Sequence, residues 1–216
     1  ETDNSPPAAR LAYSLGDLAA GGTGIAALDV PVGTGGSLVS RFLVTTRSQL
    51  VLEVVQFSRD PIADRSGLVL NGNVAYPTQF SGFDSRNVLV DPPNADPSDP
   101  SKSEQRLTRV FVSSRSPNSL VIGAVDPSTG IPRFYDNVPL PIGASRLSRM
   151  VVVDDETRGP RTRILISSFD AQRVVIFDPD LGIIRNVVST QKGPSSIATP
   201  RAIVRTGSAS PPPYAI

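Results

Sequence analysis

The stretch RVFVSSRS, residues 109–116, decides the fold because the same pattern recurs along the chain. Close copies are RFLVTTRS at 41–48 and RILISSFD at 163–170, and a fainter copy is RAIVRTGS at 201–208. Each copy is an arginine, three mostly apolar strand formers, two small residues and a turn. A sub-pattern that returns at irregular spacing predicts one supersecondary unit, repeated with loops of different length.

The composition agrees with a globular protein made of short strands. Of the 216 residues, 39% are hydrophobic and 19% are charged, while 21 prolines and 17 glycines supply turns. The formal net charge is +1, so we expect no nucleic-acid partner. No apolar run approaches the roughly 20 residues of a membrane helix, so we expect no transmembrane segment. The chain has no cysteine and no histidine.

Strand patterns dominate the chain, and helical periodicity is limited to one possible turn at residues 15–20. Turn residues separate the predicted strands, most clearly at Asp126-Pro127 and Asp178-Pro179. The predicted strands are 37–46, 49–57, 86–90, 107–113, 120–125, 149–153, 163–168, 173–177, 183–188 and 201–205.

These strands can be grouped into a repeating unit. An inner strand comes first, the recurring pattern forms the second strand, a third strand ends in Asp-Pro, and an outer strand follows a glycine turn. Such a four-stranded antiparallel meander is the blade of a β-propeller. The copies begin at residues 41, 109, 163 and 201, and a typical blade is about 40–50 residues long. The excess length is explained by inserted loops at 60–66, 91–106 and 154–161.

The third unit resembles a known repeat family. Ile164 to Ser168, Val174 to Asp178 and the segment GPSSIA at 193–198 are similar to the blades of bacterial surface-layer-type propellers, the YVTN or YncE-like repeat family. The resemblance is good over residues 106–198, weaker over 24–80 and absent in the inserted loops. It implies a propeller fold and an extracytoplasmic location, in the periplasm or on the surface of a bacterium, as a secreted protein or lipoprotein.

The number of units differs from that of a closed propeller. Closed propellers have about 4–8 blades, whereas this sequence gives about three complete units and parts of others. We therefore expect residues 10–216 to be consecutive blades of a longer propeller. Residues 1–9 are polar, contain prolines, and are interpreted as a linker or a processed N-terminus.

Few residues are candidates for catalysis or metal binding. A Ser–Lys pair would need Lys102 or Lys192, and both lie in predicted loops or turns. The carboxylates of Asp91, Asp96 and Asp99, and those of 154–156, are candidates for acid–base work or Ca²⁺ binding. We favour solvated loops and exposed turns for both groups. The glycines of GGTG at 21–24 resemble a phosphate cradle, but we interpret them as a loop into the first inner strand.

Three repeated features have structural and functional interpretations. Asp126 and Asp178 are expected to cap their turns by accepting backbone N–H bonds. The hydroxyl pairs at 45–46, 113–114 and 167–168 would either let neighbouring blades approach closely or line a central channel. The recurring arginines would either be ordinary strand-edge charges, which we favour, or form an anion-binding ring; they are Arg41, Arg109, Arg163 and Arg201.

The sequence therefore leaves two functions open. The first is a non-enzymatic binding or scaffold domain of an exported bacterial envelope protein, contacting a protein or an envelope component through its loops or channel mouth. The second is part of a propeller-type metal-dependent hydrolase or lactonase whose site lies partly in other blades. We assign no catalytic, cofactor-binding or metal-binding residue and expect no cofactor.

Overall fold

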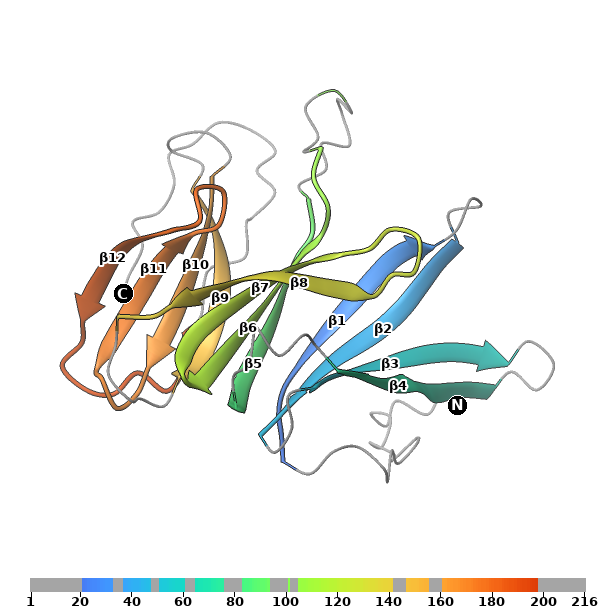
Figure 1. The fold of residues 1–216 in the computed structure, drawn as a ribbon, viewed down its shortest axis with the longest axis horizontal. Helices are drawn as coiled ribbons and strands as arrows, with labels where there is room; N and C mark the ends of the chain where they lie inside the picture. Colours follow the sequence, from blue (N-terminus) through green and yellow to red (C-terminus); the bar gives the residue numbers. More distant parts are fainter. Residues whose placement is uncertain are drawn as a thin grey trace, which may run out of the picture.

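The computed structural model describes residues 21–32, 37–47, 51–60, 65–75, 83–93, 101, 105–141, 147–155 and 161–197. Within these ranges the fold is all-β, and the described strands form three four-stranded antiparallel sheets. In each sheet the spatial order of the strands follows the sequence. Figure 1 shows the three sheets side by side in chain order, with the second sheet in the middle.

Each sheet is a meander of four consecutive strands. Sheet 1 consists of β1 (Gly22–Val32), β2 (Ser37–Thr46), β3 (Val51–Asp60) and β4 (Arg65–Ala75). Sheet 2 consists of β5 (Phe83–Asp91), β6 (Arg109–Ser116), β7 (Asn118–Val125) and β8 (Pro132–Pro139). Sheet 3 consists of β9 (Leu147–Asp155), β10 (Arg161–Ser168), β11 (Arg173–Asp178) and β12 (Ile183–Ser189).

The recurring pattern occupies the same place in every sheet. Its first three copies are the second strands β2, β6 and β10, as the sequence predicts. The fourth copy, with Arg201 and the strand predicted at 201–205, lies outside the described residues, as does the helical turn predicted at 15–20. The four-stranded antiparallel unit predicted from the repeat is therefore present three times in the described chain.

Three edge strands were not predicted as ranges: β1, which was expected only as a first inner strand without bounds, and β4 and β8. β4 contains two glycines and two asparagines, and β8 contains two prolines, an aspartate and an asparagine, so both have a weak strand propensity. Each pairs on one side only, with β3 or β7. The edge position tolerates such residues because proline at a strand start or a sheet edge loses no ladder hydrogen bond.

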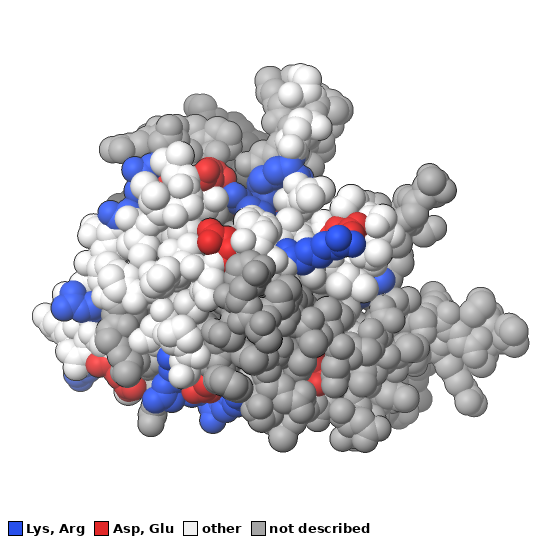
Figure 2. Space-filling model, viewed as in Figure 1, with Lys and Arg blue, Asp and Glu red and all other residues white. Residues whose placement is uncertain are grey.

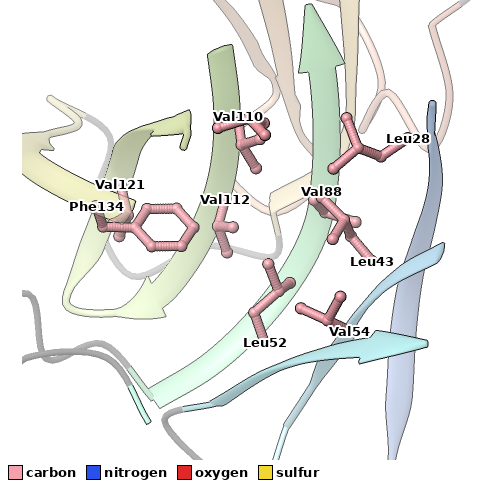
Figure 3. Packing of buried hydrophobic residues seen from close by; sticks show 10 residues of the cluster. Leu28, Leu43, Leu52, Val54, Val88, Val110, Val112, Val121 and Phe134 are labelled. Atoms are coloured by element: carbon pink, nitrogen blue, oxygen red, sulfur yellow. The ribbon is translucent and has the colours of Figure 1, made fainter. Parts of the chain in front are cut away.

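The sheets contact one another through their first strands. β5 packs against β1 and β2, and β9 packs against β5 and β6. Side chains from sheets 1 and 2 meet in one buried cluster, in which Leu28 and Leu43 face Val88 and Val110 (Figure 3). A second cluster joins sheets 2 and 3 and contains Phe111 from β6. The core therefore consists of two layers, one between sheets 1 and 2 and one between sheets 2 and 3.

The middle sheet is buried on both faces because alternate residues of β6 enter different layers. Val110 and Val112 belong to the cluster with sheet 1, whereas Phe111 belongs to the cluster with sheet 3. In β7, Val121 packs toward sheet 1, and its neighbour Ile122 packs toward sheet 3. This explains why the second strand reads as a continuous apolar run and not as a simple alternation of apolar and polar residues.

Candidate functional site

The most ordered polar features are the two Asp-Pro turns, which have the same geometry in sheets 2 and 3. Asp126 Oδ1 accepts the backbone N–H of Ser128 at 2.8 Å, and Asp178 Oδ1 accepts those of Asp180 and Leu181 at 3.1 and 3.2 Å. These bonds confirm the predicted capping role. Gly130 and Gly182 close the turns with φ of 65° and 66°, a conformation that favours glycine.

These bonds also set the acidity of the two carboxyl groups. The pKa of Asp126 is lowered, first by the Ser128 hydroxyl, which donates at 2.6 Å. For Asp178, burial acts to raise the pKa, but hydrogen bonds from Arg185 and the backbone, together with the charge of Arg163, outweigh it, and the pKa is lowered. Both side chains are therefore held as carboxylates, an arrangement suited to a structural acceptor and not to a general acid.

Two of the recurring arginines connect one sheet to the Asp-Pro turn of the next. Arg41, at the start of the pattern in β2, donates from Nη1 to the carbonyl oxygen of Thr129 at 2.6 Å. Arg109, at the equivalent place in β6, donates from Nη1 to Asp180 at 2.6 Å. Each guanidinium group thus reaches from the second strand of one sheet into the β-turn of its successor.

The environments of Arg41 and Arg109 differ in charge. Burial lowers the pKa of Arg41, whose bond to the Thr129 carbonyl brings no opposite charge. Burial also acts to lower the pKa of Arg109, but the hydrogen bond that Arg109 donates to Asp180 and the charge of Asp91 outweigh it, and the pKa is raised. Arg109 Nη2 lies 2.7 Å from Asp91 Oδ2. Arg109 therefore holds an ion pair between β5 and β6 as well as the link to sheet 3.

The favoured interpretation of these arginines as ordinary strand-edge charges needs revision. Arg41 and Arg109 are only 6% and 8% exposed, and Arg163 lies 3.1 Å from Asp178 Oδ2. Protein groups thus engage all three guanidinium groups. Arg41 and Arg109 reach the neighbouring sheet, whereas Arg163 pairs with Asp178 inside its own sheet, and none of these partners can be identified from one strand alone.

Of the predicted carboxylate sites, the structure describes only Asp91, Asp154 and Asp155. Asp91 is not in a solvated loop: it ends β5, is 4% exposed, and accepts bonds from Arg109 and from Arg106 at 3.2 Å. Asp154 and Asp155 pair with Thr162 and Arg161 inside the sheet and are not in an exposed turn. Asp96, Asp99 and Glu156 lie outside the described residues.

The remaining candidates from the sequence are the two lysines and the glycines of GGTG. Lys192 is exposed in a bend after β12, and Lys102 lies outside the described residues. Of the glycines of GGTG, Gly21 precedes the first strand with φ of 82°, whereas Gly22 and Gly24 already lie in β1, which pairs with β2 from Gly22 on. In the described part of the chain, no three or more acidic, histidine or cysteine side chains lie close enough together to hold a metal ion.

Within the same described part, no helix is long and apolar enough to cross a membrane.

The hydroxyl pairs lie buried at the ends of the second strands. Thr45 Oγ1 is 3.1 Å from Thr23 Oγ1, which in turn donates to the Ser85 carbonyl of sheet 2 at 2.6 Å. Beside them, a Cβ on Gly24 would lie 2.8 Å from Asn87 Cα and 2.9 Å from Thr45 Oγ1. The backbones of β1 and β5 therefore approach closely at a place lined by small residues. The channel-lining alternative stays a prediction.

A charged cluster that sequence reasoning missed lies at the same end of the second strands, directly after the hydroxyl pairs. Three arginines approach one carboxylate, that of Asp84, which sits in β5 with φ of 65°. On the face shown in Figure 2, the described acidic and basic side chains lie in small mixed groups. The signal in the sequence is the second arginine of the pattern, at 47 and 115, which recurs after the hydroxyl pair.

No family model matches the chain, and neither a curated protein nor a solved structure matches it significantly.

Proposed function

We propose that the three sheets are consecutive blades of a β-propeller that acts as a non-enzymatic binding scaffold of an exported bacterial envelope protein. One observation carries the proposal. The third residue of the recurring pattern and its cross-strand partner form the contact between sheets 1 and 2 and also the contact between sheets 2 and 3. Leu43 and its cross-strand partner Val54 face sheet 2, and Phe111 with its partner Ile122 faces sheet 3. Stacking of successive four-stranded meanders by one repeated contact is the organising feature of propellers.

The equivalent positions of sheet 3 support a further stacking partner. Leu165 pairs with Ile176 as Leu43 pairs with Val54. Leu43 and Val54 are fully buried, whereas Leu165 and Ile176 are only half-buried. We propose that another blade covers them in the complete propeller. With sheet faces used for stacking, the turns and loops at the two ends of the strands remain as binding surfaces, as is usual for rigid scaffolds.

The experiment that tests the architecture uses the native gene product, purified from its source. We expect electron-microscopy class averages to show a closed ring of sheets and the intact mass to match the number of sheets seen. An open particle with three sheets and an uncovered third sheet would contradict the propeller.

The binding role and the location need their own measurement. We expect the native protein to fractionate with the cell envelope, and crosslinking there to capture a protein or envelope component through the strand-end loops. The competing interpretation, a metal-dependent hydrolase or lactonase, predicts saturable binding of Ca²⁺ or Mg²⁺ and metal-dependent cleavage of lactone or ester substrates by the same preparation. Such turnover would overturn the non-enzymatic proposal.

A further inference from the structure

The cluster around Asp84 contains more positive than negative charge. Arg86 Nη2 lies 2.6 Å from Asp84 Oδ2, Arg115 Nη1 lies 3.5 Å from the same oxygen, and Arg47 Nε lies 4.0 Å from Oδ1. Among the described residues, three guanidinium groups thus share one carboxylate, which leaves an excess of two positive charges. The arginines come from three segments, the ends of β2 and β6 and the middle of β5.

The geometry separates one tightly bound arginine from two that are weakly held. Arg86 makes a short bond and is 13% exposed, whereas the side chains of Arg115 and Arg47 are 35% and 60% exposed. By comparison, Arg109 makes short bonds of 2.6 and 2.8 Å to the carboxylates of Asp180 and Asp91. Arg47 and Arg115 instead stand at long distances from Asp84, with donors accessible to solvent.

Asp84 is held in a conformation that is costly for most residues. Its φ of 65° lies in the left-handed region, which aspartate and asparagine tolerate better than other non-glycine residues. The position falls beside the register shift between Ser85 and Asn87 in the β5–β6 ladder. Backbone strain of this kind is concentrated at sites with a specific role.

We propose that Arg47 and Arg115 form an oxyanion-binding site beside Asp84, suited to a phosphate or carboxylate group of a ligand. A guanidinium group binds such planar or tetrahedral oxyanions through paired N–H donors. Two guanidinium groups with excess positive charge can hold one oxyanion between them. Asp84 and Arg86 form the fixed base of the site, and Asp84 also limits its affinity by competing for the same donors. The proposal does not depend on the number of blades in the whole protein.

The test is a titration of the 216-residue chain with inorganic phosphate and, separately, with succinate, at constant ionic strength set by chloride. We expect saturable chemical-shift changes or heats. The double variant Arg47→Gln/Arg115→Gln should weaken the affinity at least about 10-fold, because it removes both charge-assisted donors of the site. Saturable binding of phosphate alone identifies a phosphate site. Saturable binding of both anions identifies a site that also accepts carboxylates.

Two further variants distinguish a binding site from a structural ion cluster. Asp84→Asn tolerates the same backbone conformation and removes the competing charge, so it should tighten anion binding several-fold. Arg133→Gln removes an arginine that is 77% exposed and paired with Asp126 at 2.7 Å, and it should leave anion binding unchanged. Titrations that do not saturate, or equal losses in Arg133→Gln and the double variant, would overturn the proposal.

Discussion

At the scale of single residues, small side chains decide how closely the sheets approach. Gly24 of β1 faces Asn87 and Val88 of β5 so closely that an added methyl group would overlap backbone atoms. Gly22, two positions earlier on the same strand, has nothing within 4 Å of the equivalent point. The two glycines therefore differ in surroundings while sharing a strand.

Gly24→Ala is expected to destabilise the protein by about 1–3 kcal/mol, the usual cost of overpacking a close contact. Gly22→Ala is the matched control and should be neutral or slightly stabilising, because alanine restricts the unfolded chain more than glycine does. Urea unfolding of the two variants measures the difference. Equal effects would show that β1 and β5 do not meet at Gly24.

A second residue-scale prediction concerns Asp178 and pH. Because the folded-state pKa is lowered, ionised Asp178 stabilises the fold above its unfolded-state pKa of about 3.9. This contribution is lost as the pH falls from that value through the folded-state pKa. Asp178→Asn should therefore lower stability at pH 7 and flatten the decline of stability on the acid side, which thermal unfolding between pH 7 and pH 2 would record. An unchanged acid profile would contradict the role of Asp178.

At the scale of strands, the position of a residue in the recurring pattern predicts its burial only when the neighbouring sheet is known. Leu43 and Leu165 occupy the same pattern position, yet the first is fully buried and the second half-buried. The second strands themselves were predictable, because charge, apolar run and hydroxyl pair recur with little change.

Leu43→Ala is expected to cost about 2–5 kcal/mol because it opens a cavity between sheets. Leu165→Ala, in the 216-residue chain, should cost clearly less, since part of its surface is already in contact with water. Chemical denaturation of both variants tests this. In the complete native protein, the propeller proposal requires the cost at Leu165 to rise toward that at Leu43, and a persistent difference there would count against it.

The parts of the fold that sequence reasoning missed have physical causes. β4 and β8 contain prolines, glycines and asparagines that are tolerated because these strands lie at sheet edges. The partners of Arg41 and Arg109 lie 88 and 71 residues away in the chain, so no local pattern indicates them. The left-handed conformation of Asp84 has no signal in the sequence, because aspartate is common in ordinary strand ends and turns.

At the scale of the whole molecule, Arg109 ties sheet 2 to sheet 3. Arg109→Gln would remove its ion pairs with Asp91 and Asp180 and leave Asp91, which is 4% exposed, with a lost partner. Breaking a buried pair on one side costs about 3–5 kcal/mol when the remaining charge has no other partner; Asp91 keeps the bond from Arg106 at 3.2 Å, so we expect a loss toward the lower end of that range. Arg133→Gln, at an exposed pair, should cost much less. Thermal or urea unfolding compares the two, and similar small losses would show that Arg109 does not hold the sheets together.

The two-sided burial of the middle sheet has a consequence for how the molecule opens. A linear stack of similar units has a stability set by nearest-neighbour contacts, and sheet 2 alone among the described sheets has such a contact on each face. Local fluctuations should therefore begin in the outer units and reach β6 last. Amide protons of Val110, Phe111 and Val112 would then exchange with solvent only through the largest opening reactions, making β6 the slowest-exchanging described strand.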